Sequence, residues 1–188
     1  MILYTLSSDE LSDRDFLIEK YISAMANSDV SAMGELYQLI KTDVYAFALS
    51  KLGNRADAED VTQDTFVQIY KNAPLYRPEG KPMAWIITVE LNLIRKHWQR
   101  SSRTVALDGA LENESDTEDF TEEVANSEFL RSLLLRLNEG EREVITLHVN
   151  SGLKHREIAK ILDLPLSTVL SRYNRAIKKL QIIVKEGK

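Results

Sequence analysis

The sequence has no cysteine, and among its 188 residues there are only seven glycines and four prolines. Disulfides, thiolate zinc sites and cysteine nucleophiles are therefore excluded, and a reducing cytoplasm is compatible with this composition. So few glycines and prolines disfavour a sheet-rich architecture with many tight turns. No run of 18 apolar residues occurs, and the first fifteen residues carry acids without the basic start of a signal peptide. We expect a cytoplasmic protein without membrane insertion.

Residue groups typical of enzymes are also missing. The three histidines, His97, His148 and His155, are not spaced as metal ligands, and the chain contains neither a P-loop nor a G-x-S-x-G sequence. We therefore predict no enzymatic activity, no metal site and no cofactor. His155 is interpreted as a surface residue.

The net charge of −5 is unevenly distributed along the chain. Residues 154–188 contain nine lysines and arginines against three acids, whereas residues 104–130 contain nine acids and no base. A local basic segment matters more than the total charge for binding a polyanion. This asymmetry permits a nucleic-acid partner, although solvated helix faces would explain it as well.

Apolar residues recur at three- and four-residue spacings, and no segment alternates as a strand does. The predicted fold is all-α, with two small helical domains joined by a flexible acidic linker. Gly53 and Asn54 should end one helix, and Pro82 should begin another that continues to Arg100. The helices are predicted near residues 17–25, 33–52, 57–72, 82–100, 130–137, 141–150, 154–162 and 167–184.

The second domain has the spacing of a helix-turn-helix. Ile158 and Ala159 lie in its first helix, residues 163–165 form the turn, and Ser167 is placed to cap the second helix. That helix divides into an apolar stripe, with Val169, Tyr173, Ala176 and Leu180, and a polar stripe, with Ser171, Asn174, Arg175 and Lys178. A recognition helix needs this division. A plain three-helix bundle with a solvated basic face is the alternative.

Two helices of the first domain also have distinct polar faces. Asp60, Gln63 and Asp64 share one face, opposite an apolar stripe formed by Ala58, Val61, Thr65 and Ile69. Such a patch could bind a protein, or it could simply be solvated. The next helix has a polar ridge that consists of Thr88, Asn92, Arg95 and Gln99. This ridge lies between two apolar flanks. One flank contains Trp85, Ile86, Val89 and Leu93, and the other contains Ile87, Leu91, Ile94 and Trp98. This ridge suits a separated DNA strand.

These segments together resemble extracytoplasmic-function sigma factors of RNA polymerase. The stretch from Asp57 to Phe66 is similar to the family pattern D-A-E-D-hydrophobic-x-Q-[DE]-x-F, and Lys81 to Trp85 is similar to the loop that opens the promoter-melting helix. Glu157 to Ala176 matches the family's E-I-A-x-x-L-x-[IL]-P-x-x-T-V-x-S-R-x-x-R-A run. The resemblance covers residues 29–103 and 128–180.

The resemblance implies a sigma factor that binds core RNA polymerase and directs transcription from specific promoters, with an anti-sigma factor as a further partner. It implies domains at residues 1–103 and 128–188, with a linker at 104–127. Asp60, Gln63 and Asp64 would bind the polymerase clamp, and Asn92 would line a pocket for a flipped base of the −10 element. The −10 set is Thr88, Asn92, Arg95, Lys96, Gln99 and Arg100, and the −35 set is Ser171, Arg172, Asn174, Arg175, Lys178 and Lys179.

Some positions depart from the family pattern. Glu90 replaces an alanine, but we expect it to lie far from Asn92 and close to His97. Lys96 replaces a frequent aspartate. Leu170 replaces a commonly basic residue, and we expect it to lie near the core edge. These departures bear on promoter sequence. A helix-turn-helix regulator acting without core polymerase is the main alternative, and a sigma mimic that binds no promoter is another. The acidic linker is expected to shield the basic C-terminal helix.

Overall fold

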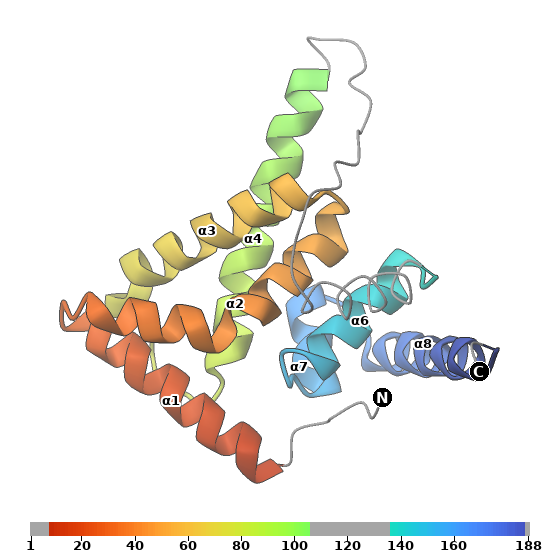
Figure 1. Ribbon diagram of the computed structural model, residues 1–188, viewed down its shortest axis with the longest axis horizontal. Helices are drawn as coiled ribbons and strands as arrows, with labels where there is room; N and C mark the ends of the chain where they lie inside the picture. The colour runs from red at the N-terminus through yellow and green to blue at the C-terminus, as the bar shows by residue number, and fades with distance from the viewer. Residues whose placement is uncertain (1–7, 106–135, 187–188) are drawn as a thin grey trace.

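The structure is a computed structural model that describes residues 8–105 and 136–186, and these residues form helices and short loops with no strand. The elements are α1 (Ser8–Ala26), α2 (Ser31–Leu52), α3 (Arg55–Asn72), the 3-10 turn η1 (Ala73–Leu75), α4 (Pro82–Val105), α6 (Glu139–Val149), α7 (His155–Leu162) and α8 (Leu166–Glu186). The predicted all-α fold with a helix-turn-helix is confirmed (Figure 1). The expected linker beyond Val105, its shielding role and the helix expected near residues 130–137 lie outside the described residues, except that residues 104 and 105 belong to α4 and residues 136 and 137 form a turn and a bend.

Local sequence explains most of the helix boundaries. Gly53 ends α2 in the left-handed conformation, with φ of 70°, and its amide donates to the carbonyl of Leu49. Asn54 caps α3 by accepting from the amide of Asp57, and Pro82 is the first residue of α4 as predicted. α4 continues to Val105, beyond the expected end at Arg100, so the domain boundary predicted at residue 103 falls inside a helix.

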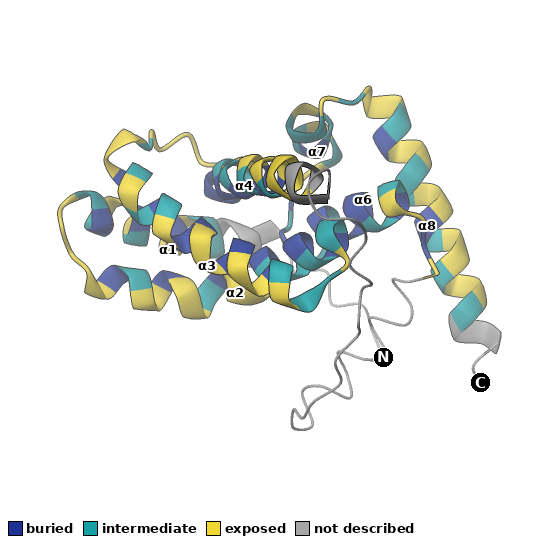
Figure 2. Cartoon of the chain, turned by 90° about the horizontal axis from the view of Figure 1, so that it is seen from above, coloured by how far each residue is buried: buried dark blue, intermediate teal, exposed yellow. Residues whose placement is uncertain are grey.

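The N-terminal helices bury one apolar face each. α2 packs against α1 and α3, and α3 packs against α4. Their shared core includes Ile22, Leu36, Phe47, Ile69 and Ile87, all of which are fully buried. Buried and exposed positions alternate along these helices in Figure 2. Burial of such side chains stabilises the fold by roughly 1.5–3 kcal/mol each. This core fixes which faces of α3 and α4 remain in solvent.

The C-terminal helices form the helix-turn-helix. Asp163 ends α7 in the left-handed conformation (φ 54°, ψ 49°), as its tolerance for that geometry predicted. The predicted cap at Ser167 is wrong, because α8 begins at Leu166 and the carbonyl of Pro165 accepts from the amide of Val169. Of the predicted apolar stripe of α8, Val169 and Ala176 are buried, whereas Tyr173 and Leu180 are half-buried.

His155 is half-buried rather than simply exposed, which corrects the sequence interpretation of it as a surface residue. Its ring stacks on that of His148 with centroids 4.3 Å apart, and both rings meet Tyr173 edge-on. Desolvation and the neighbouring His148 lower the pKa of His155. The three rings fill the space where α6, α7 and α8 meet, so the ring of His155 belongs to the packing of the helix-turn-helix.

The N-terminal and C-terminal helices pack against each other through α2 with α6 and α4 with α7 (Figure 1). The ammonium of Lys51 in α2 lies 3.1 Å from a carboxylate oxygen of Glu139 and 3.1 Å from one of Glu143, both in α6. Lys81 at the start of α4 pairs with Glu157 of α7 at 3.2 Å. Apolar side chains from both halves form one continuous buried cluster.

Candidate protein- and nucleic-acid-binding surfaces

The first candidate surface is the α3 patch, defined as Asp60, Gln63 and Asp64. All three side chains are exposed, and the stripe predicted behind them, Ala58, Val61, Thr65 and Ile69, is buried. Within the described residues, none of the three forms a hydrogen bond or ion pair. The patch therefore presents two carboxylates and an amide whose hydrogen-bonding capacity is open to a partner.

The second candidate surface is the α4 ridge, defined as Thr88, Asn92, Arg95, Lys96, Gln99 and Arg100. All six residues are exposed on one side of α4. The hydroxyl of Thr88 donates to the carbonyl of Ala84 at 2.7 Å, a local bond that leaves the oxygen able to accept another. The ridge presents cationic and amide groups, which suit phosphates and base edges.

The flanks of the ridge differ from the prediction of two buried sides. Ile86, Ile87, Leu91 and Ile94 are buried, but Trp85, Val89 and Leu93 are half-buried. Trp98 is 40% exposed, and the ammonium of Lys51 lies 5.2 Å from its ring centroid. α4 is thus embedded on one side only, and a wider face than predicted remains in contact with solvent.

Glu90 lies away from the α4 ridge, as expected, but its environment was not foreseen. Its side chain is fully buried, and neither carboxylate oxygen has a hydrogen-bond partner of good geometry. Desolvation raises the pKa of Glu90 well above its ordinary value, and the nearby backbone of Ala48 offsets this only in part. His97, the neighbour predicted from the helical wheel, instead places Nε2 3.2 Å from a carboxylate oxygen of Asp57.

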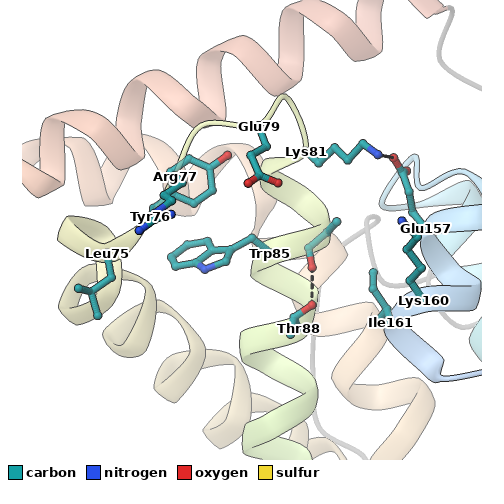
Figure 3. A pocket seen from close by; sticks show the side chains of 11 residues that line it. Leu75, Tyr76, Arg77, Glu79, Lys81, Trp85, Thr88, Glu157, Lys160 and Ile161 are labelled. Atoms are coloured by element: carbon teal, nitrogen blue, oxygen red, sulfur yellow. Dashed lines mark hydrogen bonds and ion pairs between the residues drawn. The ribbon is translucent and has the colours of Figure 1, made fainter.

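A hollow of about 460 Å³ lies where the α4 ridge begins (Figure 3). Trp85 and Thr88 line it from α4, and Lys160 and Ile161 line it from α7. The Trp85 ring packs against Tyr76 at a centroid distance of 4.9 Å, and the Lys81–Glu157 ion pair lies at the edge of the hollow. The first residue of the ridge is therefore close to the helix-turn-helix.

The third candidate surface is the α8 face, defined as Ser171, Arg172, Asn174, Arg175, Lys178 and Lys179. Five of these residues are exposed, and Arg172 is half-buried. Leu170, predicted near the core edge, is 39% exposed, and it adds an apolar group beside this face. An exposed helix face with four cations fits a nucleic-acid groove.

Two carboxylates of α6 contact three of the four cations of the α8 face, a feature that sequence reasoning missed. Glu141 accepts from Lys179 Nζ at 2.7 Å and from Arg175 Nε at 3.4 Å. Glu143 lies 3.8 Å from Arg172 Nη1 and also pairs with Lys51. The sequence N-x-x-E at residues 138–141 signals a capping box, which the structure contains, but nothing in it indicates that the same glutamate reaches α8.

Comparison with known families agrees with this geometry. The family model of sigma-70 region 2 matches residues 36–104, which contain the α3 patch and the α4 ridge. The model of sigma-70 region 4 matches residues 128–180, which contain the α8 face. The chain belongs to the sigma-70 family of RNA polymerase sigma factors. Within that family it is an extracytoplasmic-function sigma factor, an alternative sigma factor for transcription initiation.

Curated relatives of this sigma factor span most of its length. It is 28% identical to the ECF RNA polymerase sigma factor BldN of Streptomyces coelicolor over 90% of its own chain and 66% of BldN. It is 24% identical to SigW of Bacillus subtilis over 89% of its chain and 96% of SigW. The matches extend across both region 2 and region 4, so the chain resembles whole sigma factors of this group.

Solved structures share the arrangement of helices. CnrH in complex with the cytosolic domain of CnrY superposes with a TM-score of 0.60 at 25% identity, covering 92% of the sigma factor and 99% of CnrH. RpoE of Bartonella quintana, in complex with the anti-sigma factor NepR, gives a TM-score of 0.66 at 24% identity, with coverages of 83% and 98%. Among the described residues of the sigma factor, no helix is long and apolar enough to span a membrane.

Proposed function

We propose that the sigma factor binds core RNA polymerase through the α3 patch, the −10 element through the α4 ridge and the −35 element through the α8 face. The observation that supports this most strongly is that every member of the three predicted sets except the half-buried Arg172 is exposed, each set on a helix whose opposite side is buried. Each surface has the chemistry its partner requires: carboxylates for a basic protein surface, and amides and cations for DNA. The chain would then act in the cytoplasm, where core polymerase and the chromosome are.

Within this proposal, Asn92 captures a base that leaves the duplex in the −10 element. It is exposed and makes no hydrogen bond within the described residues, so its amide can pair with a base edge. Arg175 reads a base of the −35 element, and Lys178 holds phosphate. The proposed domain limits, residues 1–103 and 128–188, place one DNA-binding surface in each half.

An anti-sigma factor is the third proposed partner. The α3 patch is exposed in the isolated chain, which would let it engage polymerase at any time unless another protein covers it. The solved relative CnrH is in complex with the cytosolic domain of CnrY, and RpoE of Bartonella quintana is in complex with the anti-sigma factor NepR, which supports a protein partner of this kind. We propose that a regulatory protein binds this sigma factor and blocks polymerase binding.

Co-purification with core polymerase tests the first surface. The double reversal Asp60→Lys and Asp64→Lys should abolish co-purification, since a close charge pair at an interface is worth roughly 2–5 kcal/mol on truncation. Asp13→Lys with Glu35→Lys is the matched control, because both acids are exposed on helices outside the patch. Full core binding by a folded Asp60/Asp64 variant would overturn the assignment of the patch.

A further inference from the structure

Glu141 is an almost fully buried carboxylate beside the exposed α8 face. Its side chain is 1% exposed, whereas those of Arg175 and Lys179 are 55% and 44% exposed. One oxygen, Oε2, accepts from Lys179 and from the backbone amide of Asn138, and Oε1 accepts from Arg175. A buried acid is thus fixed by a helix cap on one side and holds two cations of α8 on the other.

The hydrogen-bond partners of Glu141 favour the ionised carboxylate despite its burial. Desolvation opposes ionisation, but hydrogen bonds from Lys179, the Asn138 amide and Arg175, with the charge of Lys179, lower the pKa of Glu141 overall. Charge-assisted hydrogen bonds to an ionised carboxylate are stronger and better oriented than neutral ones. Glu141 therefore restrains the side chains it contacts.

Arg175 is restrained at one edge of its guanidinium. Its Nε donates to Glu141 at 3.4 Å, and its Nη1 donates to Ser171 Oγ at 2.9 Å. A guanidinium has five N–H donors, so three are left by these two bonds. Nη2 has no partner among the described residues, and the edge formed by Nη1 and Nη2 still has a donor on each nitrogen. That edge matches the O6 and N7 acceptors of guanine in the major groove.

We infer that Glu141 is a positioning residue for promoter recognition, which holds Arg175 in the orientation that reads a guanine of the −35 element. This inference rests on the proposed role of the α8 face. Glu141 contacts no DNA itself, because it is buried behind Arg175 and Lys179. By fixing the arginine before binding, it lowers the conformational entropy lost when the base is read.

Two other roles for Glu141 make different predictions. If it served only as the cap of α6, its loss would weaken binding to all sequences alike through a loosened helix start. If it only neutralised the α8 cations, its loss would strengthen binding to all sequences alike. A positioning role affects the preference among bases at one promoter position, which neither of the other roles would change.

The decisive variant is Glu141→Gln, tested in the full chain bound to core polymerase. Glutamine is accepted at this position of a capping box, so the bond to the Asn138 amide is kept while the charge is removed. Binding would be measured on promoter fragments carrying each base at each −35 position, and on DNA without a promoter. We expect Glu141→Gln to lose about tenfold in preference at one position, the position that Arg175→Ala also relaxes, without weaker binding to non-promoter DNA.

Glu139→Gln is the matched control, since Glu139 is also a glutamate of the first turn of α6 but pairs with Lys51 rather than with α8. It should leave the base preferences unchanged. If Glu141→Gln shows no cooperative thermal unfolding, Glu141→Asp is the second variant: it keeps the charge but is one methylene shorter, so it should lose the contact with Arg175 and relax the same position.

The possible outcomes distinguish failure of the positioning role of Glu141 from failure of base reading by Arg175. If Arg175→Ala relaxes one position and Glu141→Gln relaxes none, or shifts all sequences equally, the positioning role is overturned while base reading by Arg175 stands. If Arg175→Ala relaxes no position, base reading itself is wrong, and the role of Glu141 is overturned with it.

Discussion

The α3 patch and the α8 face are both exposed and charged, but their charges are organised differently. Asp60, Gln63 and Asp64 make no hydrogen bond or ion pair with the described residues. On α8, Arg172, Arg175 and Lys179 are each within reach of Glu141 or Glu143 of α6. One surface meets its partner with unpaired groups, whereas the other is already held in place by its own domain.

This difference has a physical meaning for recognition. Exposed carboxylates that have no intramolecular partner break no hydrogen bond or ion pair when they meet a basic protein surface. The α3 patch therefore suits rapid association with a partner. Arginine and lysine side chains carry large rotamer entropy, and holding them beforehand favours selective reading of one DNA sequence. Under the proposed assignments, the α3 patch therefore suits encounter with a protein partner, and the α8 face suits discrimination among DNA sequences.

Asn92 on the α4 ridge, which makes no hydrogen bond within the described residues, gives the largest expected effect. Asn92→Ala should lower promoter melting by roughly 100-fold, because capture of an unstacked base is worth a few kcal/mol. Fluorescence of 2-aminopurine in the −10 element would report melting by the reconstituted holoenzyme. Gln38→Ala, an exposed amide of α2, is the control and should melt the promoter normally. Normal melting by Asn92→Ala would remove the ridge from base capture.

The junction between the two halves depends on Lys51. Its side chain is 9% exposed and that of Glu143 is 8% exposed, so removing the ammonium leaves a nearly buried carboxylate with only Arg172 nearby. Lys51→Ala should lower the free energy of unfolding by about 3 kcal/mol and increase the radius of gyration as the halves separate. Urea unfolding and small-angle scattering check both effects, with the exposed Lys41→Ala as control. An unchanged radius would mean that this contact does not hold the halves together.

Glu90 is a buried carboxyl without a hydrogen-bond partner of good geometry. Because its folded-state pKa is raised, its contribution to stability should be greatest below the ordinary value of 4.5 and should fall as pH rises towards the raised value. Glu90→Met should add about 2 kcal/mol at pH 8 and flatten this dependence. Urea unfolding between pH 5 and 8 measures both. Glu35→Met, on an exposed site, should leave the pH dependence of the wild type intact; a flat wild-type profile would contradict the account of Glu90.

Two neighbouring lysines of α8 allow a direct comparison of a cation that is paired within the protein with one that is not. The expected effect on DNA binding is the smallest of those predicted. Lys178 is exposed without a partner in the described residues, whereas Lys179 donates to Glu141 at 2.7 Å. Lys178→Ala should weaken binding to all sequences alike and reduce the salt slope by about one. Lys179→Ala should reduce it by less, because part of the lysine charge is already neutralised. Equal slopes for the two variants would show that pairing with Glu141 does not matter in the complex.

The periodicity of the sequence predicted the helices and the exposed faces well. A stripe such as Ala58, Val61, Thr65 and Ile69 identifies its own buried side, and the opposite residues are then exposed by geometry alone. Gly53, Pro82 and Asp163 predicted where helices end or begin, because each has a strong local backbone preference. These signals depend only on residues close together in the chain.

What the sequence did not predict depends on contacts between distant helices. A helical wheel places Glu90 away from Asn92 but says nothing of the α2 backbone that buries it. His155 looked exposed because its stacking on His148 and Tyr173 joins three helices. The contact from Glu141 to Arg175 links residues 34 positions apart, and no local spacing indicates it.

Run-off transcription with purified core polymerase is the most direct test of the central claim that these three surfaces form one initiation factor. On fragments of the source genome, core polymerase with the wild-type chain should produce discrete transcripts that share two upstream sequence elements. The Asp60→Lys, Asp64→Lys variant should produce none, and Arg175→Ala should relax the upstream element farther from the start site. Specific DNA binding by the free chain, with no discrete transcript from any fragment, would contradict the claim and favour a helix-turn-helix regulator that acts without polymerase.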